Sequence, residues 1–141
     1  MTYQLYYWPG IQGRGEFVRL ALEENGADYE DIGRTEGAPA LMTALKHGDV
    51  VHPPFAPPFL KCEGLLIGQT ANILYYLGPR LGLAPADEAG RLWVNQLQLT
   101  IADIVAEAHD THHPVGTALY YDDQKPEALR RAQDFTGKRM R

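Results

Sequence analysis

The chain has 141 residues, a formal net charge of −5 and a single cysteine, Cys62, which excludes an internal disulfide and a zinc site of paired cysteines. Its length suits one domain, or one domain and part of a second, and the negative charge argues against binding of a nucleic acid. Since the sequence shows no signal peptide and no membrane-spanning run of roughly 20 apolar residues, we expect a soluble, reduced, cytoplasmic protein.

The first third of the chain predicts a strand, a helix and a second strand. Residues 3–7 place two tyrosines and a leucine at alternate positions, which is typical of an aromatic-rich strand. Residues 14–25 gather apolar side chains on one helical face, and Gly26 is suited to end that helix. Residues 27–32 predict the second strand. A strand, a helix and a strand within about 30 residues indicate a βαβ unit with parallel strands.

The following segment, residues 33–58, contains five prolines. Proline lacks a backbone N–H, so prolines at this density are incompatible with a central strand. We therefore expect mostly loop here, with one short helix near residues 40–46.

A hairpin and a helix complete the first predicted domain. Residues 59–62 and 65–67 flank a glycine-containing turn and predict two antiparallel strands. Residues 71–77 predict a short helix that Gly78-Pro79 ends. The order β-α-β, loop with short helix, β-β-α is that of an α/β thioredoxin-like domain, which we place at residues 1–81.

A partial all-α domain is expected at residues 87–141. An amphipathic helix begins at Asp87 and should end near Pro114, and a last helix begins near Pro126. Two such helices cannot bury both apolar faces alone, so we expect that the chain is truncated or that a partner supplies the missing packing. We therefore predict a homodimer. The apolar face of the long helix carries Trp93, Leu97, Ile101, Ile104, Val105 and Ala108.

The same order of elements occurs in thiol-redox enzymes, which need a reactive cysteine at the start of the first helix. Residues 9–13 contain no cysteine, and Cys62 falls on a predicted strand. This pattern argues against disulfide exchange.

Three segments carry a more specific pattern. They are Tyr7-Trp8-Pro9 followed by Gly13-Arg14-Gly15 and Arg19-Leu20, then Pro58-Phe59-Leu60 before Glu63-Gly64, and last Gln69-Thr70-Ala71-Asn72-Ile73-Leu74. In this order and spacing they resemble the cytosolic glutathione transferases of the tyrosine type, the mu, pi, alpha and sigma group. The resemblance covers residues 3–83 and extends more loosely to Asp103. It implies an enzyme that activates the glutathione thiol for attack on a small hydrophobic electrophile.

The resemblance makes Tyr7 the catalytic residue. Glutathione supplies a thiol with a pKa of about 8.5 or slightly above, so the thiol is mostly protonated at neutral pH. A hydroxyl that donates to the thiolate favours the charged form. Tyrosines in strands are more often packing residues, a role that we assign to Tyr3 and Tyr6. Tyr6 is nevertheless the nearest competitor of Tyr7 for the catalytic role.

The resemblance also implies contacts with the γ-glutamyl end of glutathione. Gln69 and Thr70 lie at a predicted helix N-terminus, where backbone N–H groups bind anions. An ordinary N-cap is the alternative reading, and both readings can be true at once. Arg14 matches an arginine of the family, and a solvated helix arginine is the alternative reading. Asp103 matches an aspartate that reaches the ammonium group across a dimer interface. The implied glutathione-binding residues are Trp8, Arg14, Lys46, Pro57, Pro58, Gln69, Thr70 and Asp103.

Two details of this binding set stay open. Pro58 matches the cis-proline of the family, but the preceding residue is Pro57, which has no N–H to offer to glutathione. If the alignment slips by one residue, Pro57 is the cis-proline and Ala56 supplies the N–H. For the glycine carboxylate of glutathione the candidate cations are Lys46, Arg34 and His47.

Three histidines, His109, His112 and His113, share the spacing i, i+3 and i+4, which could bind a metal. No fourth ligand is evident, so we expect no metal and place His109 and His113 at the mouth of the electrophile pocket. No cofactor is expected, since glutathione is a co-substrate.

The prediction is thus a glutathione S-transferase, with an activity that the incomplete second domain could impair. An isomerase or a peroxidase that uses the same thiolate remains an alternative. A non-catalytic module that binds ligands or partner proteins is the alternative from a different class.

Overall fold

The computed structural model describes residues 2–46 and 51–140. The chain forms two compact units, Met1–Asn95 and Gln96–Arg141. The long helix α5 (Glu88–Asp110) contributes residues to both units.

The first unit contains a four-stranded mixed sheet with the strand order β2-β1-β3-β4. β1 (Tyr3–Tyr6) and β2 (Tyr29–Asp31) are parallel, as the predicted βαβ unit requires. β3 (Phe59–Cys62) runs antiparallel to both β1 and β4 (Leu65–Gly68). The sequence-based prediction of a thioredoxin-like order is therefore confirmed.

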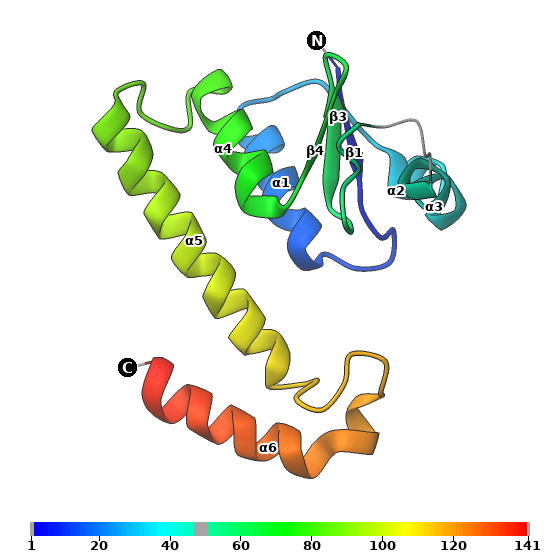
Figure 1. Ribbon diagram of the computed structural model, residues 1–141, viewed down its shortest axis with the longest axis vertical. Helices are drawn as coiled ribbons and strands as arrows, with labels where there is room; N and C mark the ends of the chain where they lie inside the picture. The colour runs from blue at the N-terminus through cyan, green and yellow to red at the C-terminus, as the bar shows by residue number, and fades with distance from the viewer. Residues whose placement is uncertain (1, 47–50, 141) are drawn as a thin grey trace. The chain divides into compact units, whose positions relative to one another are not determined.

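Helices cover both faces of this sheet (Figure 1). α1 (Gly13–Glu24) and α4 (Thr70–Arg80) lie on one face, where they pack against each other. α2 (Ile32–Thr35) and α3 (Ala38–Lys46) lie on the opposite face. The segment expected to be mostly loop thus contains two helices, of which only α3 was predicted.

The helix α2 was not predicted, because its four residues are too few to show a helical period. The Asp31 side chain accepts a hydrogen bond from the Arg34 N–H at 3.2 Å and so caps the helix. The predicted second strand consequently ends at Asp31, one residue earlier than expected.

The larger hydrophobic core lies between the sheet and the pair α1 and α4. Leu60, in the middle of β3, is paired in register with Leu5 on one side and Ile67 on the other. Side chains of α1 and α4 complete this core, and all of its buried members except Leu81 come from elements that the sequence predicted. Its buried members are Tyr3, Leu5, Val18, Leu22, Leu60, Cys62, Ile67, Ile73, Leu77 and Leu81.

A smaller core lies on the other face of the sheet. Tyr6 stacks on Phe59 there, with ring centroids 4.5 Å apart, and Ile32 and Leu41 cover the pair. Both faces of β1 are therefore buried, so its aromatic residues divide between two cores.

The predicted end of α4 at Gly78-Pro79 is wrong, because the helix continues to Arg80. The chain that follows folds back on the helix, and the N–H groups of Leu83 and Ala84 donate to the Gly78 carbonyl at 2.8 and 3.2 Å. A Cβ at position 78 would lie 2.9 Å from the Ala84 Cβ, so this close approach requires glycine.

The second unit consists of the rest of α5 and the helical elements η1 (Tyr121–Gln124), α6 (Lys125–Asp134) and η2 (Phe135–Arg139). Gln124 is buried and holds the connection between α5 and η1. Its Oε1 accepts from the N–H groups of Val115 and Gly116, and its Nε2 donates to the Gly116 and Leu119 carbonyls.

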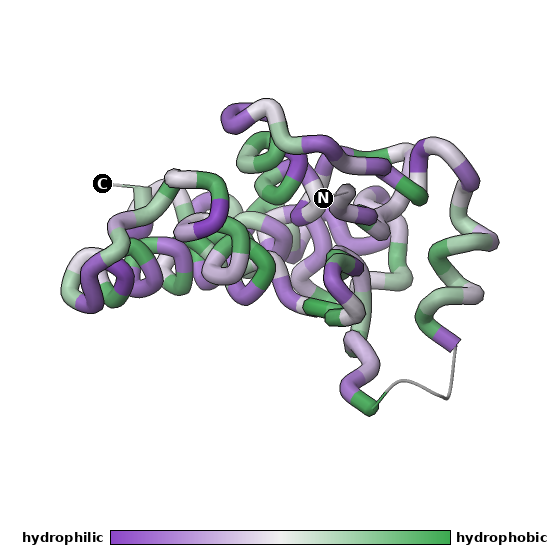
Figure 2. The backbone as a smooth tube through the Cα atoms, turned by 90° about the horizontal axis from the view of Figure 1, so that it is seen from above, coloured by the Kyte–Doolittle hydropathy of each residue, from purple (hydrophilic) through white to green (hydrophobic). Residues whose placement is uncertain are grey.

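The predicted amphipathic helix is present as α5, and several of its large apolar side chains are exposed. All of residues 88–110 are described, and none of them is buried. Hydrophobic and hydrophilic segments alternate along the helices near the C-terminus (Figure 2). None of the helices in the described part of the chain is long and apolar enough to cross a membrane.

Substitution of Leu22 by alanine tests the larger core. Leu22 is fully buried, so Leu22→Ala should lower the free energy of unfolding by about 2–5 kcal/mol. Leu20→Ala, on the same helix at a side chain that is 61% exposed, should change it by less than about 0.5 kcal/mol. Urea unfolding of both variants measures the difference, and equal losses would contradict the packing described.

A second prediction concerns high pH. Burial raises the pKa of Tyr29 to about 12, and the hydrogen bond that its hydroxyl donates to Glu23 at 2.7 Å adds to the rise. Since this pKa lies above the ordinary value of about 10, Tyr29 stabilises the fold below pH 10, and its contribution is lost as the pH rises through about 12.

The stability difference between the wild type and Tyr29→Phe should therefore shrink as the pH rises from 10 to 12. Urea unfolding at several alkaline pH values measures it. A difference that stays constant across this range would show that Tyr29 does not titrate as described.

Candidate functional site

Tyr7 follows β1 directly, and its side chain is buried at the start of α1. The Arg14 backbone N–H donates to the Tyr7 hydroxyl oxygen at 3.0 Å. This N–H belongs to the first turn of α1, where N–H groups have no partner within the helix. The tyrosine therefore satisfies a free donor of the helix, and the helix fixes the position of the hydroxyl.

Two glycines make this approach feasible. A Cβ at Gly13 would overlap the Tyr7 hydroxyl, and a Cβ at Gly15 would overlap its ring. Gly13 also has a φ of +43°, which glycine adopts without strain. The Gly-Arg-Gly sequence is thus explained by the passage of the helix over a tyrosine ring.

Thr70 is brought to the same place by the start of α4. Its hydroxyl donates to the Arg14 carbonyl at 3.3 Å. The backbone of Arg14 consequently binds both hydroxyls, that of Tyr7 through its N–H and that of Thr70 through its C=O. Three predicted site residues therefore lie together: Tyr7 after β1, Arg14 on α1 and Thr70 at the start of α4.

Gln69 precedes Thr70 in an uncommon backbone conformation, with φ of +69° and ψ of 122°. Such strain costs about 1–3 kcal/mol and occurs preferentially at functional sites. The Gln69 carbonyl accepts from the Ile73 N–H at 2.9 Å and so opens α4, while its side chain is exposed and makes no capping bond. The N–H groups of the first turn of α4 form a site of the kind that binds anions.

The two prolines before β3 are distinguished by the structure. The Pro57–Pro58 peptide bond is cis, so Pro58 is the cis-proline and the alternative with Pro57 in that role is wrong. Pro58 is buried immediately before Phe59, and Pro57 is partly buried.

The other predicted residues of the first unit lie on its surface. Trp8 and the side chain of Arg14 are exposed, and Lys46 is exposed at the end of α3. Arg34 lies 3.5 Å from Asp31 and 3.7 Å from Glu16, which engages its guanidinium group in ion pairs. The remaining candidate, His47, lies outside the described residues.

Asp103, His109 and His113 belong to the second unit. Asp103 is exposed on α5, and the rings of His109 and His113 lie 5.0 Å apart. His113 Nδ1 is also 3.3 Å from the Gln124 side chain, so this histidine has a structural contact. Within residues 2–46 and 51–140, no cluster of three or more His, Cys, Asp or Glu side chains could hold a metal ion.

A buried ion pair beside Tyr7 was not predicted from the sequence. The Arg19 guanidinium is buried, binds Asp31 at 2.6 Å and lies 5.7 Å from the centroid of the Tyr7 ring. Arg19 is a charged residue directly after the apolar Val18 on α1, and this neighbourhood is the signal from which its burial could have been predicted.

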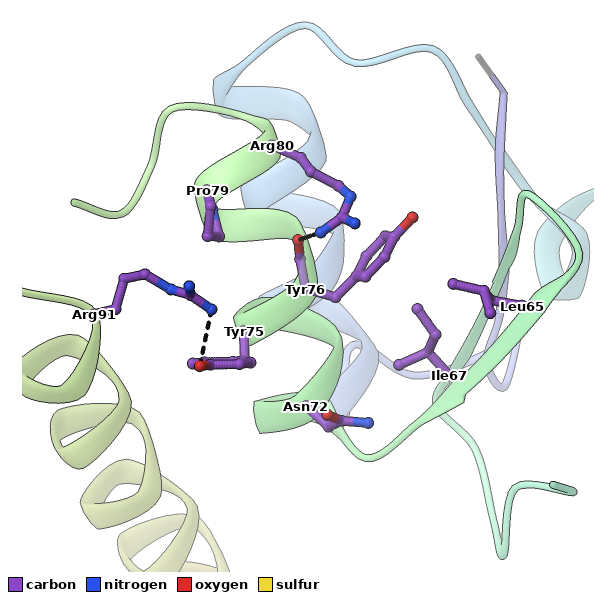
Figure 3. A pocket seen from close by; sticks show the side chains of 8 residues that line it. All are labelled: Leu65, Ile67, Asn72, Tyr75, Tyr76, Pro79, Arg80 and Arg91. Atoms are coloured by element: carbon purple, nitrogen blue, oxygen red, sulfur yellow. Dashed lines mark hydrogen bonds between the residues drawn. The ribbon is translucent and has the colours of Figure 1, made fainter. Parts of the chain in front are cut away.

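A cavity of about 380 Å³ lies on another side of α4 (Figure 3). Arg91 donates to the Tyr75 hydroxyl at 2.8 Å across one side of it, and Arg80 lies over the Tyr76 ring at 3.7 Å. Its described lining includes none of the residues around the Tyr7 hydroxyl. Since these contacts tie the first turn of α5 to α4, we assign them a structural role. The lining residues are Leu65, Ile67, Asn72, Tyr75, Tyr76, Pro79, Arg80 and Arg91.

Comparison with known proteins identifies relatives of the chain. No protein-family model matches it. It is 31% identical over 121 residues to glutathione S-transferase P 10 of Caenorhabditis elegans, a match that covers 85% of this chain and 51% of that protein. It is 35% identical over 91 residues to glutathione S-transferase 1 of Ascaris suum, a match that covers 62% of this chain and 40% of that protein. The chain thus spans about half the length of the curated relatives it matches.

Solved structures show the same likeness. The glutathione S-transferase from Ascaris lumbricoides superposes with a TM-score of 0.62 at 26% identity, over 98% of this chain and 69% of that one. Prostaglandin synthase D of Nilaparvata lugens superposes with a TM-score of 0.67 at 23% identity, over 98% of this chain and 62% of that one. The fold is therefore shared along nearly the whole of this chain.

The contact between Gly15 and Tyr7 can be tested with one methyl group. Alanine in a helix is ordinarily favoured over glycine by about 1 kcal/mol. Because the added methyl would overlap the Tyr7 ring, Gly15→Ala should instead destabilise the protein by about 1–3 kcal/mol. Thermal unfolding measures this loss, and near-ultraviolet circular dichroism reports the displaced ring. Gly10→Ala, where no atom lies within 4 Å, is the control. A stabilised Gly15→Ala variant would contradict the geometry.

Proposed function

Given that the chain is related to the glutathione S-transferases by sequence and by fold, we propose that it binds glutathione and activates the glutathione thiol. The reaction is attack of the thiolate sulfur on a small hydrophobic electrophile. The observation that carries this proposal is the hydrogen bond from the Arg14 N–H to the Tyr7 hydroxyl oxygen.

This hydrogen bond leaves Tyr7 with the chemistry that the reaction needs. A phenol has one O–H to donate and an oxygen that accepts. Since the Arg14 N–H occupies the oxygen, the O–H proton remains available for a thiolate. Each unit by which the thiol pKa falls corresponds to about 1.4 kcal/mol of preferential stabilisation of the anion.

The start of α4 supports binding of the γ-glutamyl end of glutathione. Its carboxylate suits the free N–H groups beside Gln69 and Thr70 and the positive end of the helix dipole. The exposed Arg14 side chain adds a positive charge to this region. Trp8, Pro57 and Pro58 line the approach to the thiol in this proposal, and Lys46 binds the glycine carboxylate.

The second unit supports a homodimer. Leu97, Ile101 and Ile104 of α5 are 42%, 48% and 41% exposed, which is a large apolar face for a monomer. In a dimer, Asp103 binds the γ-glutamyl ammonium of the opposite subunit, and His109 and His113 border the electrophile. The proposed role is conjugation and detoxification of electrophiles in the cytoplasm, with no cofactor. A non-catalytic binding module is the competing function, and the missing N–H at Pro57 favours it.

Replacement of Tyr7 by phenylalanine tests the proposal. Tyr7→Phe removes only the hydroxyl, so conjugation at neutral pH should fall by about 10²-fold, the effect of losing one donor to a developing anion. Calorimetric titration should still detect glutathione, because the contacts at α4 remain. A thiol-conjugation assay with a chromogenic electrophile measures the rate.

Tyr6→Phe is the matched control, since Tyr6 is buried in the smaller core on the opposite face of the sheet. It should leave the rate unchanged. A loss of rate in Tyr6→Phe alone would transfer the catalytic role to Tyr6. A folded wild-type protein that does not bind glutathione would favour the non-catalytic module.

A further inference from the structure

Arg19 is an unusual residue for the core side of α1. It is 2% exposed, and burial of a guanidinium is costly unless the charge is paired. Its Nε binds Asp31 Oδ2 at 2.6 Å, and its Nη1 binds Glu16 Oε2 at 2.9 Å. Desolvation lowers the pKa of Arg19, but these two carboxylates outweigh it and raise the pKa, so the group stays charged.

Stability alone does not explain this arrangement. Replacing a buried ion pair by well-packed apolar residues is often neutral or stabilising. Moreover, Arg19 Nη2 is buried without a hydrogen-bond partner in the described part of the chain. The guanidinium is instead placed 5.7 Å from the centroid of the Tyr7 ring, within the range of a cation–π attraction.

The partner of Arg19 connects the same tyrosine to the other face of the sheet. Asp31 Oδ1 accepts from the Arg34 N–H and so caps α2. In the first turn of α2, a Cβ at Gly33 would overlap the Tyr7 backbone carbonyl oxygen. The helix that Asp31 caps therefore lies directly against the Tyr7 backbone.

The Arg19–Asp31 pair thus joins two elements that determine the position of Tyr7. α1 supplies the N–H that holds the tyrosine hydroxyl, and α2 packs against its carbonyl. α1 therefore holds the Tyr7 hydroxyl, and α2 packs against the Tyr7 backbone. If the distance between α1 and α2 changed, the hydroxyl would move relative to that backbone.

We propose that Arg19 is a positioning residue for Tyr7, which it holds at the distance from α1 that thiol activation requires. This inference rests on the proposed function. It implies that loss of Arg19 impairs the chemistry at the thiol and leaves the binding of glutathione at α4 largely intact.

Three variants of the full chain test the role. Arg19→Met removes the charge while keeping an unbranched side chain. In Arg19→Met/Asp31→Asn the asparagine oxygen can still cap α2, and no unpaired carboxylate is left buried, which guards against loss of the fold. Arg19→Lys restores the charge and should recover part of the activity.

Tyr29→Phe is the matched structural control. The Tyr29–Glu23 hydrogen bond also links β2 to α1, but it includes neither Tyr7 nor a hydrogen-bond partner of Arg19. This variant should lower the melting temperature without changing the pH profile of conjugation.

The expected result is a rate lowered at least about tenfold in the two variants that contain Arg19→Met, with an apparent pKa of the pH–rate profile that moves up toward that of free glutathione, about 8.5. Calorimetry should show a similar affinity for glutathione. In the Tyr7→Phe background, Arg19→Met should have little further effect, because residues that act through one another are not additive.

Two results would overturn the proposal. The first is a folded Arg19→Met/Asp31→Asn variant that keeps the wild-type pH profile. The second is a loss of rate on Arg19→Met that is as large in the Tyr7→Phe background as in the wild type. If the wild type itself does not bind glutathione, the proposed function fails and this inference fails with it. That failure is visible before any variant is made.

Discussion

The structure of the first unit depends on the close contact between Tyr7 and the first turn of α1. A helix can receive a hydroxyl at its N-terminal N–H only if its own residues leave room for the ring. Gly13 and Gly15 provide that room on α1, and Gly33 provides it at the carbonyl of the same tyrosine. Tyr7 is therefore held by several features at once. These are the succession of β1 and α1, the glycines at the contact points and, through the Arg14 backbone, the placement of Thr70.

The sequence predicted well those elements that periodicity defines. The strands of the sheet, α1, α4 and α5 were expected, because alternating or helical spacing of apolar residues reports which side chains face a core. The helix α2 and the end of α4 were not predicted. The helix α2 begins at the Asp31 cap, and the end of α4 is fixed by hydrogen bonds from residues 83–84 to Gly78. Neither kind of contact leaves a periodic pattern in the sequence.

The candidate site was predicted in part, for a similar reason. The resemblance assigned Tyr7 to the thiol of glutathione and Arg14 and Thr70 to its γ-glutamyl end, and the structure brings the three residues within hydrogen-bonding distance. It could not show that Arg14 acts through its backbone, since a sequence names only side chains. The burial of Arg19 was also missed, because pairing with Asp31 depends on a crossover from α1 to β2 that spacing alone does not determine.

The dual use of the Arg14 backbone has a consequence for how this site can change over evolutionary time. The spacing between the Tyr7 and Thr70 hydroxyls is set by the N–H and C=O of one helical residue, and these groups are the same for nearly every amino acid. A substitution at position 14 therefore changes the charge beside the proposed γ-glutamyl position and leaves in place the backbone groups that align the two hydroxyls.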